Sequence, residues 1–480
     1  MRATGRLSIA GMLLLPVMGV ARSVDADEPI AAREPRLMSE TAEITSVVDA
    51  FDEDDPFDLN LVLGFSQSWK HASIRRETQI AQPGLATGGF IPATENIASY
   101  SSTVSTLLVG ADVGIYRDLA LILRLPVILG WSQSLGDLSG SQAVAAQLLQ
   151  DPAGGQLFAV PFSSPRRSGV DYIAAGLDWA IFNQQRDRTK ATWVVGVEGR
   201  LALGTPLHAC NANPPPNVAA CPDPVTGLNR DPGISRGVES IILKSVWSRR
   251  FGYVEPYSGF WVQADFPNAN SDLGMWNPTA NLERNPPLLG SFALGLEVVP
   301  YERREQFQRL SADFRFKGTY HSPGRDYSEL FDALGSSQAP SLRTANPSSY
   351  IANPNAGGPP SIADPASERV YFTGVTEEQA YGSCTVSAAA TWQAGEYVKL
   401  TIGSAFTYAQ PHLVTAADPC NASITDPAQA GSCRGTMNGR TVIAGAPNPD
   451  HRDVIDLPGH RFSVDDTTVV DLYVMGIVMF

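Results

Sequence analysis

The chain has 480 residues, of which 43% are hydrophobic and 18% are charged, and its formal net charge is −14 at pH 7. Its mean hydropathy of −0.08 excludes a bundle of transmembrane helices, each of which needs about 20 consecutive apolar residues. No basic run offsets the acidic balance. Nucleic acid is therefore not an expected partner, because phosphate binding requires clustered Lys and Arg.

The first 26 residues predict a cleaved secretory signal. Two arginines give a positive start, and the apolar run that follows is too short for a permanent membrane anchor. Small residues allow cleavage after Ala21 or after Ala26. We therefore expect an exported chain in which residues 1–26 are removed and residues 27–56 form an acidic periplasmic leader.

The leader contains a helical pattern. Ile44, Val47, Val48 and Phe51 recur at i, i+3, i+4 and i+7, which is the spacing of one face of an α-helix. The pattern predicts a short amphipathic helix that either plugs the periplasmic end of a barrel or packs loosely as a leader.

From residue 57 onward, the chain repeats a pattern in which apolar and polar residues alternate. This period of two is typical of a strand with one apolar face. Short polar turns follow Ile115, Phe182, Ser248, Tyr301 and Trp392. The other connections are long, and the expected loops cover residues 72–99, 132–168, 205–236, 267–286, 321–376 and 410–462.

The alternation of short and long connections predicts an outer-membrane type of barrel. The predicted strands number twelve, and an even number places both chain termini on the same side of the membrane. We expect an all-β fold over residues 57–480. It is a transmembrane antiparallel up-and-down β-barrel with short periplasmic turns and long extracellular loops.

The last predicted strand, TTVVDLYVMGIVMF at Thr467–Phe480, alternates apolar residues and ends on an aromatic residue. This ending resembles the signal by which outer-membrane barrels of Gram-negative bacteria are recognised for assembly. The resemblance implies that Phe480 and its strand engage the barrel-assembly machinery. It also implies that the outward face of the barrel contacts outer-membrane lipid.

Charged residues fall on one face of the predicted strands. An arginine that faced lipid at the middle of a bilayer would cost roughly 2–4 kcal/mol, so Asp112 and Arg124 are expected to face the lumen. The same parity gives the lumen-lining candidates Asp58, Asp112, Arg124, Asp178, Glu198, Arg200, Lys244, Glu255, Glu297, Asp313, Arg315, Lys317, Lys399 and Asp471. Two interpretations remain open. Facing rows of charge form a constriction that selects polar solutes, or the charges pair and seal a narrow barrel.

Five cysteines lie in this exported chain. Cys210 and Cys221 lie close together in one predicted loop, and Cys420 and Cys433 in another, which predicts two local disulfides. Neither pair has the spacing of a metal site, and we expect no metal and no cofactor. Cys384 is left on a predicted strand, where we expect a small packed thiol rather than a nucleophile.

One short motif raises an enzymatic alternative. His71-Ala72-Ser73 has the His-x-Ser spacing found in outer-membrane phospholipases. A triad also requires an orienting partner and an oxyanion hole, and no further matching motif surrounds this pair. Surface residues at the base of a loop are the favoured interpretation, so the chain is not expected to be an enzyme.

Two predicted hairpins carry a resemblance to a known family. GIYRDLALILRLPVIL (114–129) and AAGLDWAIFNQQRDRTKATWVVGVEGRLALGTP (174–206) resemble hairpins of the outer-membrane proteins associated with phenol meta-cleavage pathways. Leu177 replaces a glycine of that pattern, and the cysteine-containing loops depart from it. The resemblance implies a twelve-stranded barrel that admits small, often apolar compounds.

The favoured function is a channel or porin-like transporter for passive uptake of small molecules, apolar or aromatic compounds among them. The alternative is a non-transporting surface protein whose disulfide-stapled loops bind a partner. An open lumen with Gly and Ala at its waist would favour transport, whereas a plugged lumen with paired Arg and Asp would favour the alternative.

Overall fold

The computed structural model describes residues 41–50, 58–81, 90–138, 142–276, 281–348, 350–351, 362–363, 368–424, 431–437 and 440–480. The predicted signal and the first part of the predicted leader lie outside these ranges.

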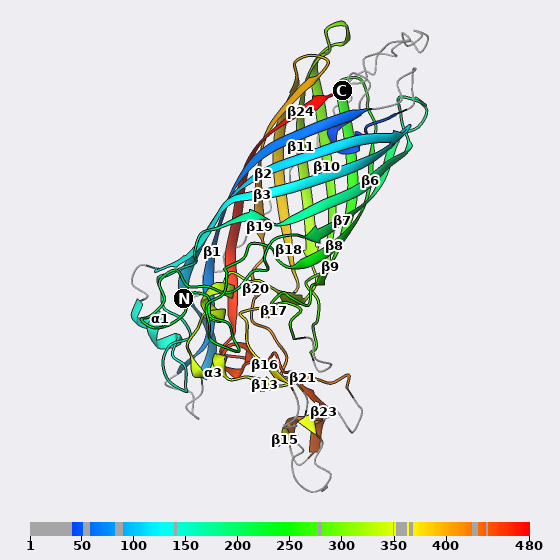
Figure 1. Cartoon of the computed structure of the whole chain (residues 1–480). Helices are drawn as coiled ribbons and strands as arrows, with labels where there is room; N and C mark the ends of the chain where they lie inside the picture. Colours follow the sequence, from blue (N-terminus) through cyan, green and yellow to red (C-terminus); the bar gives the residue numbers. More distant parts are fainter. Residues whose placement is uncertain are drawn as a thin grey trace, which may run out of the picture.

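Twelve strands form one closed antiparallel barrel, which confirms the predicted fold class (Figure 1). Successive barrel strands are hydrogen-bonded neighbours, and β1 also pairs with β24, so the sheet is closed. In order around the barrel, the strands are β1 (Leu59–Ala81), β2 (Phe90–Tyr116), β3 (Leu119–Gly136), β6 (Tyr172–Phe182), β7 (Thr192–Ala202), β8 (Val238–Ser248), β9 (Val254–Pro267), β10 (Leu289–Arg303), β11 (Gln308–His321), β18 (Tyr381–Gln393), β19 (Val398–Ala409) and β24 (Phe462–Met479).

The outward face of the barrel is apolar. On β1, Leu61, Leu63 and Phe65 are 44%, 57% and 44% exposed, whereas Val62 between them is 4% exposed. The same alternation continues on β18 and β19. A continuous band of exposed aliphatic and aromatic side chains is suited to the hydrocarbon of a bilayer.

The two ends of the barrel differ, as the connections predict. Short turns after β2, β6, β8, β10 and β18 lie at the end that also carries the C-terminus, at the top of Figure 1. The long connections gather at the other end. Among the described residues, no helix is both long and apolar enough to span a membrane.

The expected loop over residues 72–99 is wrong, because β1 and β2 continue through most of it. The two strands extend beyond the other strands, and their inward side chains Ile74 and Ile97 are fully buried. The charged residues in this stretch, such as Arg75, Arg76 and Glu77, are typical of a loop and led to the wrong prediction. Its apolar residues pack against other protein segments rather than lipid.

The long connections form a folded cap over one barrel end. A buried core joins these connections to the extended strands and includes Ile74, Leu149, Leu330, Leu334, Ile455 and Phe462. Its described elements are α1 (Gln142–Leu148), β4 (Phe162–Ser163), β5 (Arg167–Val170), β12 (Gly324–Asp326), α2 (Phe331–Gly335), α3 (Pro340–Arg343), β13 (Asn346–Pro347), β14 (Tyr350–Ile351), β15 (Ile362–Ala363), β16 (Arg369–Val370), β17 (Thr376–Glu378), β20 (His412–Leu413), β21 (Cys420–Asn421), β22 (Gly431–Met437), β23 (Arg440–Pro447) and α4 (Asp453–Asp456).

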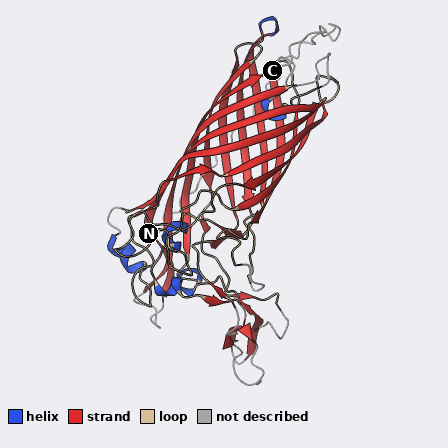
Figure 2. Cartoon of the chain, in the orientation of Figure 1, coloured by secondary structure: helices blue, strands red, loops and turns tan. Residues whose placement is uncertain are grey.

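The predicted leader helix is wrong. Within the described residues 41–50, the one helical segment is a 3-10 turn, η2 (Glu43–Thr45), and it lies inside the short-turn end of the barrel (Figure 2). The chain then runs to Ala50, which forms a β-bridge with Arg117 in the β2–β3 turn. The backbone N–H groups of Glu43 and Ala50 donate to the barrel, to Glu297 and Arg117, and the segment itself contains the backbone hydrogen bond from Thr45 to Ala42. Phe51, the last residue of the predicted pattern, lies outside the described ranges.

The cysteines divide into three cases. Cys210 and Cys221 form a disulfide in the cap, as predicted. Cys420 is also disulfide-bonded, whereas the side chain of Cys433, its predicted partner, is outside the described part of the chain. Cys384 is exposed on the outward face of β18, so the expected packed thiol is wrong. Strand parity turns this side chain away from the lumen.

Candidate functional site

Most of the predicted lumen charges lie in ion pairs inside the barrel. In one pair, Arg124 Nη2 donates to Asp112 Oδ2 at 2.9 Å, between neighbouring strands. In another, Arg309 Nη2 donates to Glu297 Oε1 at 2.9 Å. The remaining pairs join Asp178 to Lys244, Glu198 to Arg200, Asp313 to Arg315, and Lys399 to Glu43 of the leader.

Four predicted lumen residues are outside this set of pairs. Asp58 is buried just before β1, and Asp471 is half-buried on β24. Glu255 is fully buried beside Glu297. Lys317 lines a central cavity.

The leader closes the short-turn end of the lumen. Thr45 Oγ1 lies 2.7 Å from Ser248 Oγ on β8, and the Glu43 N–H donates to Glu297 Oε2 at 3.0 Å. Lys399 forms an ion pair with Glu43 from the opposite direction. A cavity of about 190 Å³ remains between this segment and the wall. We call residues 41–50 the inner plug.

A larger chamber of about 470 Å³ lies deeper in the barrel, and side chains from β3, β6 to β11 and β18 line it. It shares Ile122, Asp178 and Lys244 with the cavity beside the inner plug, so the two spaces adjoin at these side chains. Gly196 makes room at this waist, because a Cβ there would approach Asp178 Oδ1 to 2.2 Å. The chamber wall is mixed, with three cations and two carboxylates beside Trp261 and neutral polar side chains.

The cap reaches into the opposite end of the lumen. Glu329, which lies between β12 and α2, forms an ion pair with Lys70 on β1. Tyr327 and Phe331 stack edge to face beside it, with ring centroids 4.6 Å apart. These groups border a third cavity of about 260 Å³. Both ends of the lumen are therefore obstructed in this conformation.

A buried ion pair fixes α2 in the cap. Arg167 Nη1 and Nη2 donate to the two carboxylate oxygens of Asp332 at 2.9 and 2.7 Å. The backbone N–H of Cys210 donates to the same carboxylate at 2.8 Å. The disulfide loop and the segment that enters the lumen are thus joined through one side chain.

Buried carboxyl groups in the cap are shifted in pKa. Burial raises the pKa of Glu377 on β17 to about 8, against a hydrogen bond of 3.0 Å from Asn448, and nearby Asp450 contributes to the rise. Burial also raises the pKa of Asp456 in α4 to about 6. Both groups lie outside the barrel wall.

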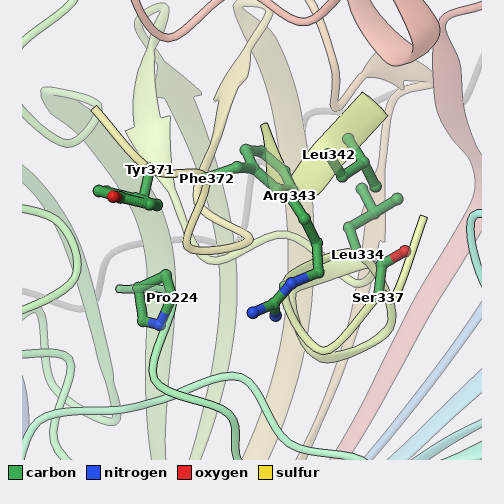
Figure 3. Close-up of a pocket in the computed structure, with 8 residues that line it drawn as sticks. Pro224, Leu334, Ser337, Leu342, Arg343, Tyr371 and Phe372 are labelled. Carbon is green, nitrogen blue, oxygen red and sulfur yellow. The ribbon is translucent and has the colours of Figure 1, made fainter. Parts of the chain in front are cut away.

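A second cleft in the cap is too small for a ligand. Pro224, Leu334 and Leu342 lie on its wall with Arg343 and Tyr371 (Figure 3). Its volume is about 10 Å³, which is about the space that one water molecule needs.

The His-x-Ser motif lies on the outside of the barrel. His71 is exposed on β1, and Ser73 shares its outward parity. No side-chain hydrogen bond to either residue occurs within the described chain. The geometry does not assemble the nucleophile and base that a triad requires.

Several lumen residues were not predicted. Arg309 pairs with Glu297, and Tyr257 accepts a hydrogen bond from Arg315 Nε at 3.0 Å. Trp261 and Gln263 line the chamber on β9. Strand parity places all four inward. Arg309 has the same parity as Asp313 and Arg315 on β11, and the parity rule finds the other three when it is applied to uncharged residues as well.

No protein-family model matches the chain, and no curated protein matches it in sequence. Among solved structures, it is similar to a deltaS2 mutant of the TodX monoaromatic hydrocarbon channel, at 9% identity and a TM-score of 0.32, over 92% of this chain and 94% of that one. It is also similar to an outer membrane channel from Pseudomonas putida F1, at 9% identity and a TM-score of 0.30, over 90% of this chain and 100% of that one. It is similar as well to a FadL homologue of Pseudomonas aeruginosa, at 8% identity and a TM-score of 0.30, over 88% of this chain and 90% of that one. Likenesses at this level carry no functional argument, so function must be argued from the lumen.

Proposed function

We propose that this chain is an outer-membrane barrel of a Gram-negative bacterium that admits small molecules by passive diffusion. Its apolar outward face supports insertion into outer-membrane lipid. Phe480 is 62% exposed at the end of β24, where the barrel-assembly machinery could engage it. Its backbone N–H donates to the Leu59 carbonyl at 2.9 Å, so the last residue also helps to close the barrel.

The central chamber is the observation that carries this proposal. Protein interiors are close-packed, and the voids in them are few and small. A lumen that served only as a core would be filled by side chains. Here about 470 Å³ stays open next to the cavity beside the inner plug, and this volume is within the range of small-molecule sites.

Passage requires the inner plug to move. Polar contacts hold it to the wall, namely those of Thr45 with Ser248 and of Glu43 with Lys399 and Glu297. Water can replace such contacts, because the net contribution of a hydrogen bond is about 0.5–1.5 kcal/mol between neutral groups and about 1.5–3 kcal/mol where one group is charged. The lumen combines features expected of a transporter with features expected of a non-transporting surface protein. Glycine at the waist and an open chamber favour transport, whereas the paired charges and the plug favour the alternative.

A reversible crosslink tests this proposal. Thr45 and Ser248 are in side-chain contact, so Thr45→Cys with Ser248→Cys would fix the plug to β8. Both are made in a Cys384→Ala background, and the refolded full chain is studied in planar bilayers. We expect discrete conductance steps from the background protein, and we expect them to be lost on oxidation of the double variant and restored by dithiothreitol.

The control carries Ser248→Cys alone and receives the same oxidation and reduction. It separates plug release from reduction of the native cap disulfide. A silent background protein, with correct folding shown by heat-modifiable gel migration, would refute passage through the lumen.

The folded cap favours the second candidate function, a surface protein whose loops bind a partner. Its buried core and the Arg167–Asp332 ion pair give the loops a fixed shape. The silent result described above would leave this function as the favoured one.

A further inference from the structure

One lumen cation has no counter-ion among the residues that the structure describes. Lys317 lies on β11 and faces the central chamber. In the described part of the chain, its ammonium has no carboxylate within ion-pair distance and no hydrogen-bond acceptor. Arg315 and Arg200, both cations, are close enough to act on its charge. The chain as a whole is acidic, so an uncompensated positive group in its lumen is a specific local feature.

Arg200 is a second cation beside the chamber, and part of its hydrogen-bonding capacity is unused among the described residues. Arg200 Nε donates to Glu198 Oε1 at 2.7 Å. The described structure gives no acceptor to the two terminal nitrogens of Arg200. The guanidinium also lies over the ring of Tyr172, with its carbon 4.9 Å from the centroid, which fixes the plane of the group. Two cationic donor groups therefore contribute to one wall region.

Neutral side chains around Lys317 add hydroxyl groups and apolar surface to the same site. The hydroxyls of Ser291 and Thr319 lie 2.9 Å apart on β10 and β11, and either can donate. Trp261, Ile242 and Leu289 supply aromatic and aliphatic surface in the same chamber. Cations and hydroxyls suit a carboxylate, and the apolar side chains suit a compact hydrocarbon body.

We propose that the chamber binds a small organic carboxylate with an apolar or aromatic body, with Lys317 as its counter-ion and Arg200 as a second donor. This names a solute class for the proposed channel, and its role in uptake rests on that proposed function. Binding itself does not, because the chamber can fill while the lumen is closed to ion flow.

Isothermal titration of the refolded full chain in a neutral detergent tests the site. Benzoate is the anionic probe, and benzyl alcohol is a neutral probe of similar shape. The variant is Lys317→Gln, which keeps a long polar side chain and removes the charge. Lys190→Gln is the matched control, because Lys190 lies exposed on the β6–β7 turn, away from the chamber.

We expect the unmodified chain to bind benzoate more tightly than benzyl alcohol, and Lys317→Gln to lose roughly tenfold or more in benzoate affinity. Benzyl alcohol affinity should change little in the same variant, and Lys190→Gln should leave both unchanged. Lys317→Arg should restore the preference for the anion in part. Heat-modifiable gel migration shows that each variant is folded.

Two results would refute the proposed carboxylate site. Either benzoate does not bind, or Lys317→Gln binds it as well as the unmodified chain does. The proposed function is judged separately by conductance. Benzoate binding with silent bilayers would refute passage and keep the site, whereas conductance without benzoate binding would refute the site and keep the channel.

Discussion

Glu255 and Glu297 face each other directly across β9 and β10, inside the barrel beneath the inner plug. Glu297 is compensated by Arg309 and by the backbone N–H of Glu43. Glu255 is fully buried, and no hydrogen-bond partner for its carboxylate oxygens occurs among the described residues. Two carboxyl groups at this spacing repel each other when both are charged.

These opposite environments predict opposite effects of the same substitution. Glu255→Gln should stabilise the barrel by about 1–3 kcal/mol, because it removes the repulsion between two facing carboxyl groups. Glu297→Gln should destabilise it by a similar amount or more, because the ion pair with Arg309 would be lost. Thermal unfolding in detergent, followed by gel mobility, measures both. A loss of stability in Glu255→Gln would show that this carboxylate is stabilising.

The ion pair between Arg167 and Asp332 predicts that one cap residue controls the order of several loops. Asp332→Asn would leave the Arg167 guanidinium, which is 1% exposed, without a charged partner. Removing one partner of a buried pair typically costs about 3–5 kcal/mol. We expect early unfolding of the cap in guanidinium, seen by near-ultraviolet circular dichroism, while the barrel stays heat-modifiable.

The matched control for that substitution is Asp187→Asn on the exposed β6–β7 turn, which should have no measurable effect on either transition. Equal unfolding of both variants would mean that cap stability does not depend on the buried pair.

Cap stability should fall as pH rises. The pKa of Glu377 is raised from 4.5 to about 8 by burial, so folding of the cap favours its protonated form. The resulting stabilisation is fully present below about pH 4.5 and is lost as pH rises through about 8. Asp456, with a pKa raised to about 6, acts in the same direction.

Guanidinium unfolding of the cap at pH 5, 6.5 and 8.5 (chosen to span roughly these transitions) measures this dependence. Glu377→Gln should flatten the profile, since the glutamine keeps the hydrogen bond of Asn448 to a side-chain oxygen and cannot ionise. A profile that stays steep in Glu377→Gln would assign the pH dependence to other groups.

Strand parity predicted the barrel because it is a local property. Arg124 cannot face lipid cheaply, so its neighbours along β3 are assigned to one face or the other without knowledge of distant residues. The inner plug could not be predicted in this way. Its helical spacing is real, but Glu43 is bonded to Glu297 and Lys399, which are hundreds of residues away and outweigh local propensity.

The candidate site was predictable in part for the same reason. Parity turned Lys317 and Arg200 toward the lumen, yet it could not show that Arg200 pairs with Glu198 whereas Lys317 pairs with nothing described. Which charges meet depends on strand register and on side-chain direction across a closed sheet. The ion pair between Arg167 and Asp332 depends on how two long loops fold over the barrel end. The periodic pattern of apolar residues does not predict that fold.

Gly114 gives a direct test of the inner plug as a gate. It lies on β2 beside residues 49 and 50 of the plug, and a Cβ there would lie 1.9 Å from the Asp49 carbonyl oxygen. Gly114→Ala should therefore push the plug from its position, because backbone cannot yield to such a clash as a flexible side chain can. We expect more frequent conductance steps in planar bilayers and faster labelling of a Val47→Cys probe by a maleimide reagent.

Gly395→Ala is the control for this substitution, since position 395 lies in the β18–β19 turn with no heavy atom within 4 Å of an added Cβ. It should leave conductance and labelling unchanged. Both variants should keep heat-modifiable migration, because an added Cβ at position 114 meets only the plug and one at position 395 meets nothing. If Gly114→Ala increases labelling at position 47 but leaves conductance unchanged, the plug moves without opening a path. The obstruction that limits passage would then be the cap, where Glu329 meets Lys70.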